Sequence, residues 1–197
     1  YNLTNTGYDD FFFAKYNTMG NLIWAKKIGG KLDDKWVDIV LDNTGNIYAT
    51  GGFKDTVDFD PGPGIQKMVS AGGRDIFLAK LTPFGNLAWA KRMGSSNSEI
   101  GIDICLDLNN NLLIAGSFSG TVDFDPDQAQ SFFLTASGLG TGNMFSAKYN
   151  SSGDFIWAIA TGGTISSWAS TIATDPVGNI IVVGPFAGTT DFDPGPN

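Results

Sequence analysis

One seven-residue motif occurs three times in the chain, at residues 56–62, 121–127 and 189–195, and each copy contains Asp-Phe-Asp-Pro. The copies are 65 and 68 residues apart, and the extra residues of the longer interval lie around residues 139–141. Self-similarity at a fixed period is typical of proteins in which each repeat packs against its neighbours. We therefore expect the repeat to determine the fold.

The composition favours strands and tight turns over helices. Of the 20 acidic residues, 19 are Asp, which favours turns, and the chain has 26 Gly. The net charge of −8 argues against a nucleic-acid partner. Because no run of about 18 apolar residues occurs, we expect no membrane insertion. The chain lacks an initiator Met and a signal segment, which predicts a processed product or a fragment and leaves its location open.

Each repeat predicts four short strands joined by hairpin turns. Recurring Gly with Asn or Asp supplies the positive φ that such turns need, as at Gly20, Gly85 and Gly153 and again at Gly45, Asn110 and Gly178. The third strand of a repeat is apolar on both faces, which indicates a strand between two other layers. In the first complete repeat the strands are predicted at residues 37–42, 47–53, 75–81 and 87–93, in that order outward from an axis.

Four-stranded antiparallel units of this size are typical of β-propeller blades, so the predicted fold class is all-β with three repeat units of 65–68 residues. We expect one repeat domain over residues 1–197, with units at about 1–64, 65–130 and 131–197. In this phase residues 1–28 supply two outer strands, and residues 169–186 supply two inner strands. Either these ends combine into a ring of three blades, or the chain is a segment completed by further blades or by another copy. We favour the segment, because propellers usually have four to eight blades.

The strand and turn sequences also resemble a known family. Residues 75–81 (DIFLAKL), 85–91 (GNLAWAK) and 42–51 (DNTGNIYATG) are similar to the SBBP-type β-propeller repeat of bacterial secreted and surface proteins. The resemblance covers all three copies, although the Asp-Phe-Asp-Pro stretch and the short strand after it are inserted here. It implies a propeller fold and a secreted or bacterial cell-surface location, and hardly implies an activity.

The Asp-Phe-Asp-Pro loops are the candidate site. Strand alternation places the Phe on one side, where Phe59, Phe124 and Phe192 would hold the loop to the body, and the two carboxylates on the other. Paired carboxylates are hard oxygen ligands that suit Ca²⁺. The alternative is that each Asp caps a turn. The candidate metal ligands are Asp58, Asp60, Asp123, Asp125, Asp191 and Asp193, and Asp127 adds a charge in the second loop.

The other conspicuous side chains favour packing over chemistry. A Trp recurs at residues 24, 89 and 157, which indicates either a sugar-stacking surface or, as we favour, a packing contact between adjacent repeats. The single cysteine, Cys105, lies in an apolar run and is expected to be a small core residue. The recurring Lys15, Lys80 and Lys148 are expected to be solvated or paired with the repeated Asp residues. With no His and no nucleophile constellation, we expect no enzyme.

The sequence therefore supports a non-catalytic structural or adhesive surface module, a scaffold that presents acidic loops to a protein partner or to further copies or blades of itself. Calcium would stiffen the loops. The alternative is a glycan-binding module, which requires Trp36 or Trp168 to be exposed. A third hypothesis places catalytic residues in blades outside this segment.

Overall fold

The computed structural model describes residues 1–32, 34–137 and 142–193, and the insertion around residues 139–141 lies outside them. Within the described residues the regular structure consists of antiparallel strands, with no helix that could span a membrane. The strands are β1 (Phe11–Tyr16), β2 (Leu22–Gly30), β3 (Lys35–Leu41), β4 (Ile47–Asp58), β5 (Lys67–Leu81), β6 (Leu87–Met93), β7 (Ile100–Leu106), β8 (Leu112–Phe118), β9 (Thr121–Asp123), β10 (Phe133–Thr135), β11 (Asn143–Tyr149), β12 (Phe155–Ala160), β13 (Gly162–Gly163), β14 (Ser166–Ser167), β15 (Thr171–Thr174), β16 (Ile180–Val183), β17 (Phe186–Ala187) and β18 (Thr190–Asp191).

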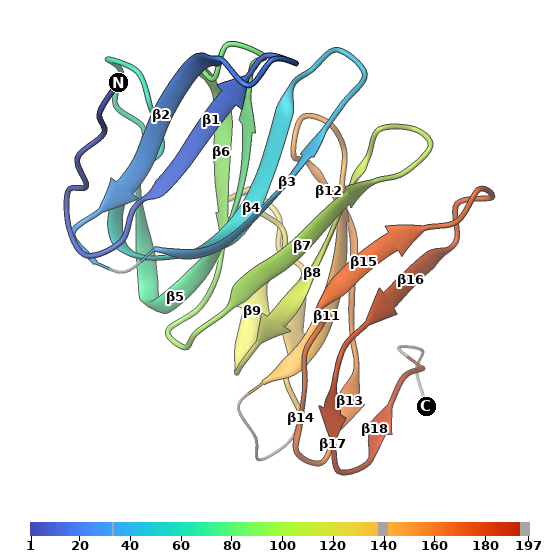
Figure 1. Cartoon of the computed structure of the whole chain (residues 1–197). Coiled ribbons are helices and arrows are strands. Elements are labelled where there is room, and N and C mark those ends of the chain that lie inside the picture. The colour runs from blue at the N-terminus through green and yellow to red at the C-terminus, as the bar shows by residue number, and fades with distance from the viewer. Residues whose placement is uncertain (33, 138–141, 194–197) are drawn as a thin grey trace.

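The strands form two complete four-stranded units with the predicted order. The first full unit is β3-β4-β5-β6 and the second full unit is β7-β8-β11-β12. The N-terminal half-unit, β1-β2, corresponds to the two outer strands, and the C-terminal half-unit, β15-β16, to the two inner strands. The inner strands β3, β7 and β15 lie side by side and stack the units (Figure 1). The all-β, repeating architecture is confirmed.

The two half-units lie at opposite ends of the stack (Figure 1). Among the described residues, β1 pairs with β2 alone and β16 with β15 alone. The chain therefore does not join its own ends into a ring of three units, and the stack is open.

The hairpin turns have the predicted backbone. Gly20, Gly85 and Gly153 have φ between 71° and 80°, and the matching turns of the inner hairpins have positive φ at Gly45, Asn110 and Gly178. Glycine adopts this region at no steric cost, and Asn is the substitution it tolerates best. Because the turns are short, each unit is a meander of adjacent antiparallel strands.

The Asp-Phe-Asp-Pro insertion extends the second and third strands of a unit and also ties neighbouring units together. In the first full unit, Val57 of β4 pairs with Met68 of β5. The same end of β4 pairs with the end of β2 through Gly30↔Val57 and Gly29↔Asp58. Equivalent links are Gly94↔Asp123 and the β13–β18 pair. The sequence predicts the inserted strand and gives no direct indication of the link between units.

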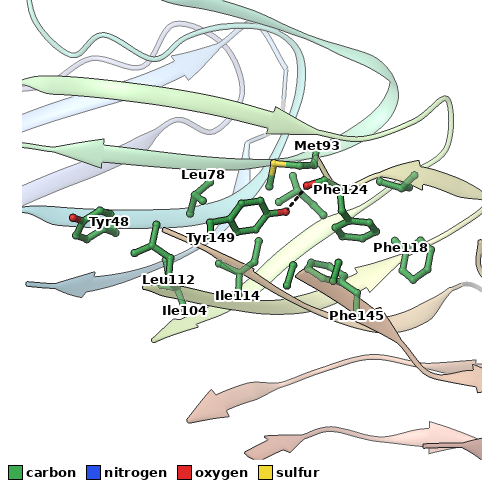
Figure 2. Packing of buried hydrophobic residues seen from close by; sticks show 14 residues of the cluster. Tyr48, Leu78, Met93, Ile104, Leu112, Ile114, Phe118, Phe124, Phe145 and Tyr149 are labelled. Atoms are coloured by element: carbon green, nitrogen blue, oxygen red, sulfur yellow. Dashed lines mark hydrogen bonds between the residues drawn. The ribbon is translucent and has the colours of Figure 1, made fainter. Parts of the chain in front are cut away.

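The main core lies between the two full units, as Figure 2 shows. Tyr48 and Leu78 of the first full unit face Leu112, Ile114 and other apolar residues of the second. Both faces of β11 and of residues 75–81 in β5 are buried, as predicted from their two-sided apolar pattern. Apolar contact between successive units therefore replaces the single central core of a smaller domain.

The recurring Trp packs against the outer hairpin turn of the next unit. The ring of Trp24 lies 3.1 Å from the position a Cβ would take at Gly85, and the ring of Trp89 lies 2.9 Å from that position at Gly153. The interpretation of Trp24 and Trp89 as packing contacts between repeats is confirmed. Glycine is needed at these turns both for the backbone and for the ring above it.

This contact predicts a large difference between two Gly→Ala substitutions. Gly178 and Gly153 share a positive φ, but no atom lies within 4 Å of a Cβ at Gly178. Gly178→Ala should cost about 1 kcal/mol of unfolding free energy, from backbone strain alone. Gly153→Ala should cost about 2–4 kcal/mol, because it also displaces Trp89. Urea denaturation measures both, and equal losses would show that the ring does not rest on this turn.

Candidate functional site

The Asp-Phe-Asp-Pro loops combine a buried aromatic side with an outward-facing acidic side. Val57 and Phe59 are fully buried, whereas Asp58 and Asp60 are half-exposed. Phe59 contacts Phe53 and Phe77, with ring centroids 5.2 and 5.1 Å apart. In the second loop Phe124 contacts Phe118 and Phe145 in the same way. The predicted alternation is confirmed in both loops.

The third loop differs from the prediction. Phe192 is 60% exposed, and within the described residues its one aromatic contact is Phe186, with centroids 5.6 Å apart. The prediction that Phe192 holds its loop to the body is therefore wrong in this structure. The physical reason is that the C-terminal half-unit lacks the third strand that supplies Phe77 or Phe145 in the full units.

The paired carboxylates cap the turns of their own loops. Asp58 Oδ1 accepts hydrogen bonds from the backbone N–H groups of Asp60 (3.1 Å) and Gln66 (2.8 Å), and Asp60 Oδ1 accepts one from Gly62 (2.7 Å). In the second loop, Asp123 Oδ1 accepts from the backbone N–H groups of Asp125 and Phe132, and Asp125 Oδ1 accepts from that of Asp127. In the third loop, Asp191 Oδ1 accepts from the backbone N–H of Asp193. Asp127 in turn accepts from Ala129 N, so its extra carboxylate caps a further turn.

Turn capping therefore accounts for the described side-chain hydrogen bonds of five of the six aspartates, Asp58, Asp60, Asp123, Asp125 and Asp191. In the described part of the chain, no three His, Cys, Asp or Glu side chains gather as a metal-binding group. Carbonyl oxygens also serve as Ca²⁺ ligands, so calcium stays a proposal and is taken up below.

A polar groove runs between the second loop and the preceding unit. It has a volume of about 410 Å³ and lies where Gly94 of the first full unit meets Asp123. Its walls carry opposite charges, Lys91 and Arg92 from β6 on one side and Asp123, Asp125 and Asp127 on the other. The groove forms where the Gly94↔Asp123 bridge brings the second loop against β6. The Gly that recurs after each outer strand, at Gly29, Gly94 and Gly162, is the sequence signal that marks its position.

Arg92, which lines this groove, also forms an ion pair with a buried carboxylate. Asp75 is fully buried, and its Oδ2 lies 2.6 Å from Arg92 Nη1 and accepts a hydrogen bond from Ala71 N. Burial raises the pKa of the Asp75 carboxyl, although these donors oppose the rise. The second full unit has Asn143 at the position of Asp75, where its Nδ2 donates to Thr161 O. Sequence analysis did not single out this pair.

A second acidic contact joins the inner strands. Asp38 Oδ2 of β3 accepts from Ile104 N of β7, and Asp103 Oδ2 of β7 accepts from Ile172 N of β15. Burial, and then the hydrogen bond to Asp103, raise the pKa of Asp38 to about 6. Burial also raises the pKa of Asp103, but hydrogen bonds from Asp38 and Thr171 outweigh it, so that pKa is lowered. Asp38 is therefore the member of the pair that takes up a proton first as the pH falls.

These groups predict an unusual pH dependence of stability. Burial raises the pKa values of Asp34, Asp38 and Glu99 to about 6, so the folded chain binds more protons than the unfolded chain between pH 4 and 6. The unfolding free energy should therefore rise as the pH falls from 7 to 5, by on the order of 1 kcal/mol. Below about pH 4 it should fall again, because turn caps such as Asp107, with a lowered pKa of about 2, become protonated.

Urea denaturation at pH 7 and pH 5 measures this effect, and Asp38→Asn is the matched variant. The amide that replaces the carboxyl in this variant cannot titrate, so the contribution of Asp38 to the rise should disappear. An unfolding free energy that falls steadily from pH 7 to 5 in the wild type would contradict the assignment.

The recurring Lys residues and Cys105 were also singled out by the sequence. Lys148 Nζ lies 2.7 Å from Asp107 Oδ2, which confirms one of the expected Lys–Asp pairs, while Lys15 Nζ donates to Pro83 O and Lys80 lies over the ring of Tyr48. Cys105 is half-buried against an apolar cluster, and burial raises the pKa of its thiol to about 11, which disfavours the thiolate.

The glycan hypothesis requires Trp36 or Trp168 to be exposed, and the structure describes the side chain of Trp168. Trp168 is 42% exposed and lines a groove of about 540 Å³ together with Ile102 and Ser117. The side chain of Trp36 lies outside what the structure describes.

No model of a known protein family matches the chain. The chain is 30% identical over 172 residues to a protein named as an uncharacterized WD repeat-containing protein of Acanthamoeba polyphaga mimivirus. The match covers 82% of this chain and 12% of that protein, so the chain spans about an eighth of its length. The similarity is thus to part of a long repeat-containing protein.

Proposed function

We propose that the chain is a non-catalytic β-propeller scaffold whose Asp-Phe-Asp-Pro loops bind a protein partner. WD repeats form propeller blades of four strands, and the chain resembles a protein named for such repeats. The observation that carries the proposal is the repetition of the loop itself. Each loop leaves its unit at the same position, with carboxylates outward and, in both full units, its Phe buried. A surface built three times suits multivalent binding better than a reaction, which needs one asymmetric site.

The groove beside the second loop gives the partner its expected chemistry. Lys91 and Arg92 face Asp123, Asp125 and Asp127 across a polar space, which suits a peptide segment carrying both charge signs. Two photo-crosslinking residues test this directly. One replaces the exposed Gln128 in the loop, and the matched control replaces Leu108, which is 67% exposed in the turn at the other end of β8.

In extracts of the source organism, the Gln128 probe should capture a discrete protein that excess wild-type chain competes away. The Leu108 probe should not capture it. Equal capture by both probes, or capture that a chain with Asp123→Ala and Asp125→Ala competes as well as wild type does, would refute loop-directed binding.

Calcium is proposed as a stabiliser of the loops, because each contains two carboxylates, which are hard oxygen ligands. Saturating Ca²⁺ should raise the Tm by about 5 °C or more over the value in chelator. The combined variant Asp58→Ala, Asp123→Ala and Asp191→Ala should lose this difference, although it also loses turn caps. Identical Tm values with Ca²⁺ and chelator in the wild type would leave the carboxylates as turn caps alone.

We propose an adhesive role at a bacterial surface or in a secreted protein, and the resemblance to SBBP-type repeats supports the location. Fractionation of the source cells, with detection of this chain in the surface or medium fractions, tests that location. A purely internal fraction would contradict it.

A glycan-binding module is the second candidate, favoured by the exposed Trp168 beside its groove. Oligosaccharide titration should then quench Trp fluorescence in the wild type and fail to do so in Trp168→Ala. Quenching that persists in Trp168→Ala would remove this candidate.

A further inference from the structure

The junctions on the two sides of the second full unit share one packing arrangement but differ in a side chain that fills it. At the first junction, Arg74 lies over Gly52, with its Cδ and Cγ 2.6 and 2.9 Å from the position that a Cβ would take at Gly52. Ile100 of the second full unit packs at the same place, with its Cγ1 3.2 Å from that position. An arginine side chain therefore occupies the space between these two units.

The second junction has a groove at the place that Arg74 occupies in the first. The second full unit has Asn143 at the position of Asp75. The residue before Asn143 is therefore the counterpart of Arg74, and it is Gly142. The groove beside Gly142 has a volume of about 540 Å³, within the range of about 300–1,000 Å³ that is usual for ligand pockets. Replacement of one long side chain by glycine thus leaves room for a ligand.

This groove is mostly apolar and contains one exposed aromatic ring. β7 and β8 supply Ile100, Ile102 and Ser117, and the segment between β14 and β15 supplies Trp168, which is 42% exposed. The first junction is built from the equivalent segments, which are β3, β4 and the residues leading into β7. Both junctions lie inside the chain, so the groove results from the change of side chains between them.

A buried carboxylate gives the groove a charge preference. In the first full unit, burial raises the pKa of Asp34 to about 6, and the charge of Arg74 is among the influences that oppose this rise. The counterpart of Asp34 is Glu99, since each accepts a hydrogen bond from the backbone N–H four residues earlier, at 3.0 and 2.9 Å. Glu99 is 1% exposed, and burial raises its pKa to about 6. The charge of Asp75 adds to this rise, and that of Arg92 opposes it.

We propose that this groove binds an arginine side chain of a partner protein, at the place that Arg74 takes in the first junction. The methylene stem would pack on Ile100 and Ile102, and the guanidinium would stack on Trp168 with Glu99 nearby. A guanidinium suits this place better than an ammonium, because it is planar, weakly hydrated and stacks on aromatic rings. The net charge of −8 also attracts a cationic segment.

This site is separate from the groove beside the second loop, which other residues line. Arginine binding therefore goes beyond the proposed loop binding, and either can fail without the other. Trp168 also carries the glycan candidate. The two ligands differ in charge, so a charged probe and its neutral analogue distinguish them.

Titration of the full chain with a blocked peptide tests the proposal through the indole N–H resonance of Trp168 in isotope-labelled protein. The spectrum of Trp168→Phe assigns this resonance among those of the five Trp residues. The probe is N-acetyl-Gly-Arg-Gly-amide, and the control peptide carries citrulline, which has a similar shape without the charge. We expect a saturable shift with a Kd of about 1 mM for the arginine peptide, and binding of the citrulline peptide weaker by about tenfold or more.

Two variants locate the site by blocking it. Ser117→Arg places an arginine of the chain itself in the groove, and it should weaken binding of the arginine peptide by about tenfold or more. Gly142→Arg is less suitable, because the φ of 143° at Gly142 disfavours a side chain. Ser152→Arg is the matched control, since Ser152 is exposed in the turn at the other end of β11. This control should bind the peptide as the wild type does.

Glu99→Gln separates the charge from the shape of the groove. This variant should bind the arginine peptide as weakly as the wild type binds the citrulline peptide, and its binding of the citrulline peptide should stay unchanged. Circular dichroism checks that the variant keeps its fold. Because Ser117→Arg changes a residue that lines the groove and leaves Glu99 in place, it tests the site even where Glu99→Gln is unstable.

Three results would overturn the proposal. One is equal affinity of the wild type for the two peptides, or no saturable shift of the Trp168 resonance up to roughly 10 mM peptide. Another is wild-type affinity in Ser117→Arg, because the peptide would then bind elsewhere. The third is a shift of the Trp168 resonance with an oligosaccharide and not with the arginine peptide, which would assign the groove to the glycan candidate.

Discussion

Replacing Phe124 with alanine is expected to lower the unfolding free energy by about 3–5 kcal/mol. Phe124 is fully buried, and its ring centroid lies 5.4 Å from that of Phe118 and 4.9 Å from that of Phe145. Truncation removes both the apolar burial and these aromatic contacts, and it leaves a cavity between the inserted loop and the body of the unit. The two remaining rings are not free to fill it, because Phe118 is held in β8 and Phe145 in β11.

The control for this experiment is Phe84→Ala. Phe84 is 73% exposed, so its loss should change stability by no more than about 0.5 kcal/mol. Phe59→Ala should reproduce the loss seen in Phe124→Ala, because the first full unit buries the same trio. Urea denaturation followed by circular dichroism gives all three values. A loss below about 1 kcal/mol in both buried variants would mean that the loops are not held by their Phe residues.

Removing Arg92 is expected to cost about 3 kcal/mol at pH 7, which is toward the lower end for breaking a buried ion pair. Asp75 is fully buried, so Arg92→Ala leaves its charge with Ala71 N–H as the described donor. The estimate is at the lower end because the Arg92 side chain is 37% exposed, and because Asp75, whose pKa burial already raises, can take up a proton.

A double variant separates the buried charge from the loss of packing. The second full unit has Asn143 and Ala160 where the first has Asp75 and Arg92. Asp75→Asn with Arg92→Ala therefore copies an arrangement the chain already tolerates, and it should recover most of the loss. The cost of Arg92→Ala alone should shrink at pH 4, since protonation removes the uncompensated charge. A double variant as unstable as the single one would contradict this account.

The sequence predicts the fold well because the repeat aligns each residue with its counterparts. Residues buried on both faces of β5 and β11, and the positive-φ turn residues such as Asn110, follow from spacing and local chemistry. The strand order β3-β4-β5-β6 follows from hairpin connections. These features are local or come from neighbouring strands, which is why pattern alone suffices for them.

Other features depend on contacts between units and are not visible in one repeat. The Gly29↔Asp58 link and the Asp38–Ile104 hydrogen bond join residues that repeat spacing does not pair. Phe192 fails its prediction for the same reason, since its burial needs a strand from outside its half-unit. The role of the candidate site could not be predicted from the sequence. The Asp58 and Asp60 carboxylates suit a turn cap or a metal ligand, and only a binding measurement separates these roles.

The central claim is that the chain is a stack of four-stranded units tied together by the inserted loops. Solution NMR of the full chain tests it most directly, through contacts between backbone protons of facing residues. The account predicts contacts between Phe145 and Gly116 within the second full unit, and between Gly94 and Asp123 across units. Contacts within single units without any at Gly94–Asp123 would contradict it, because the inserted loop would then not tie the two units together.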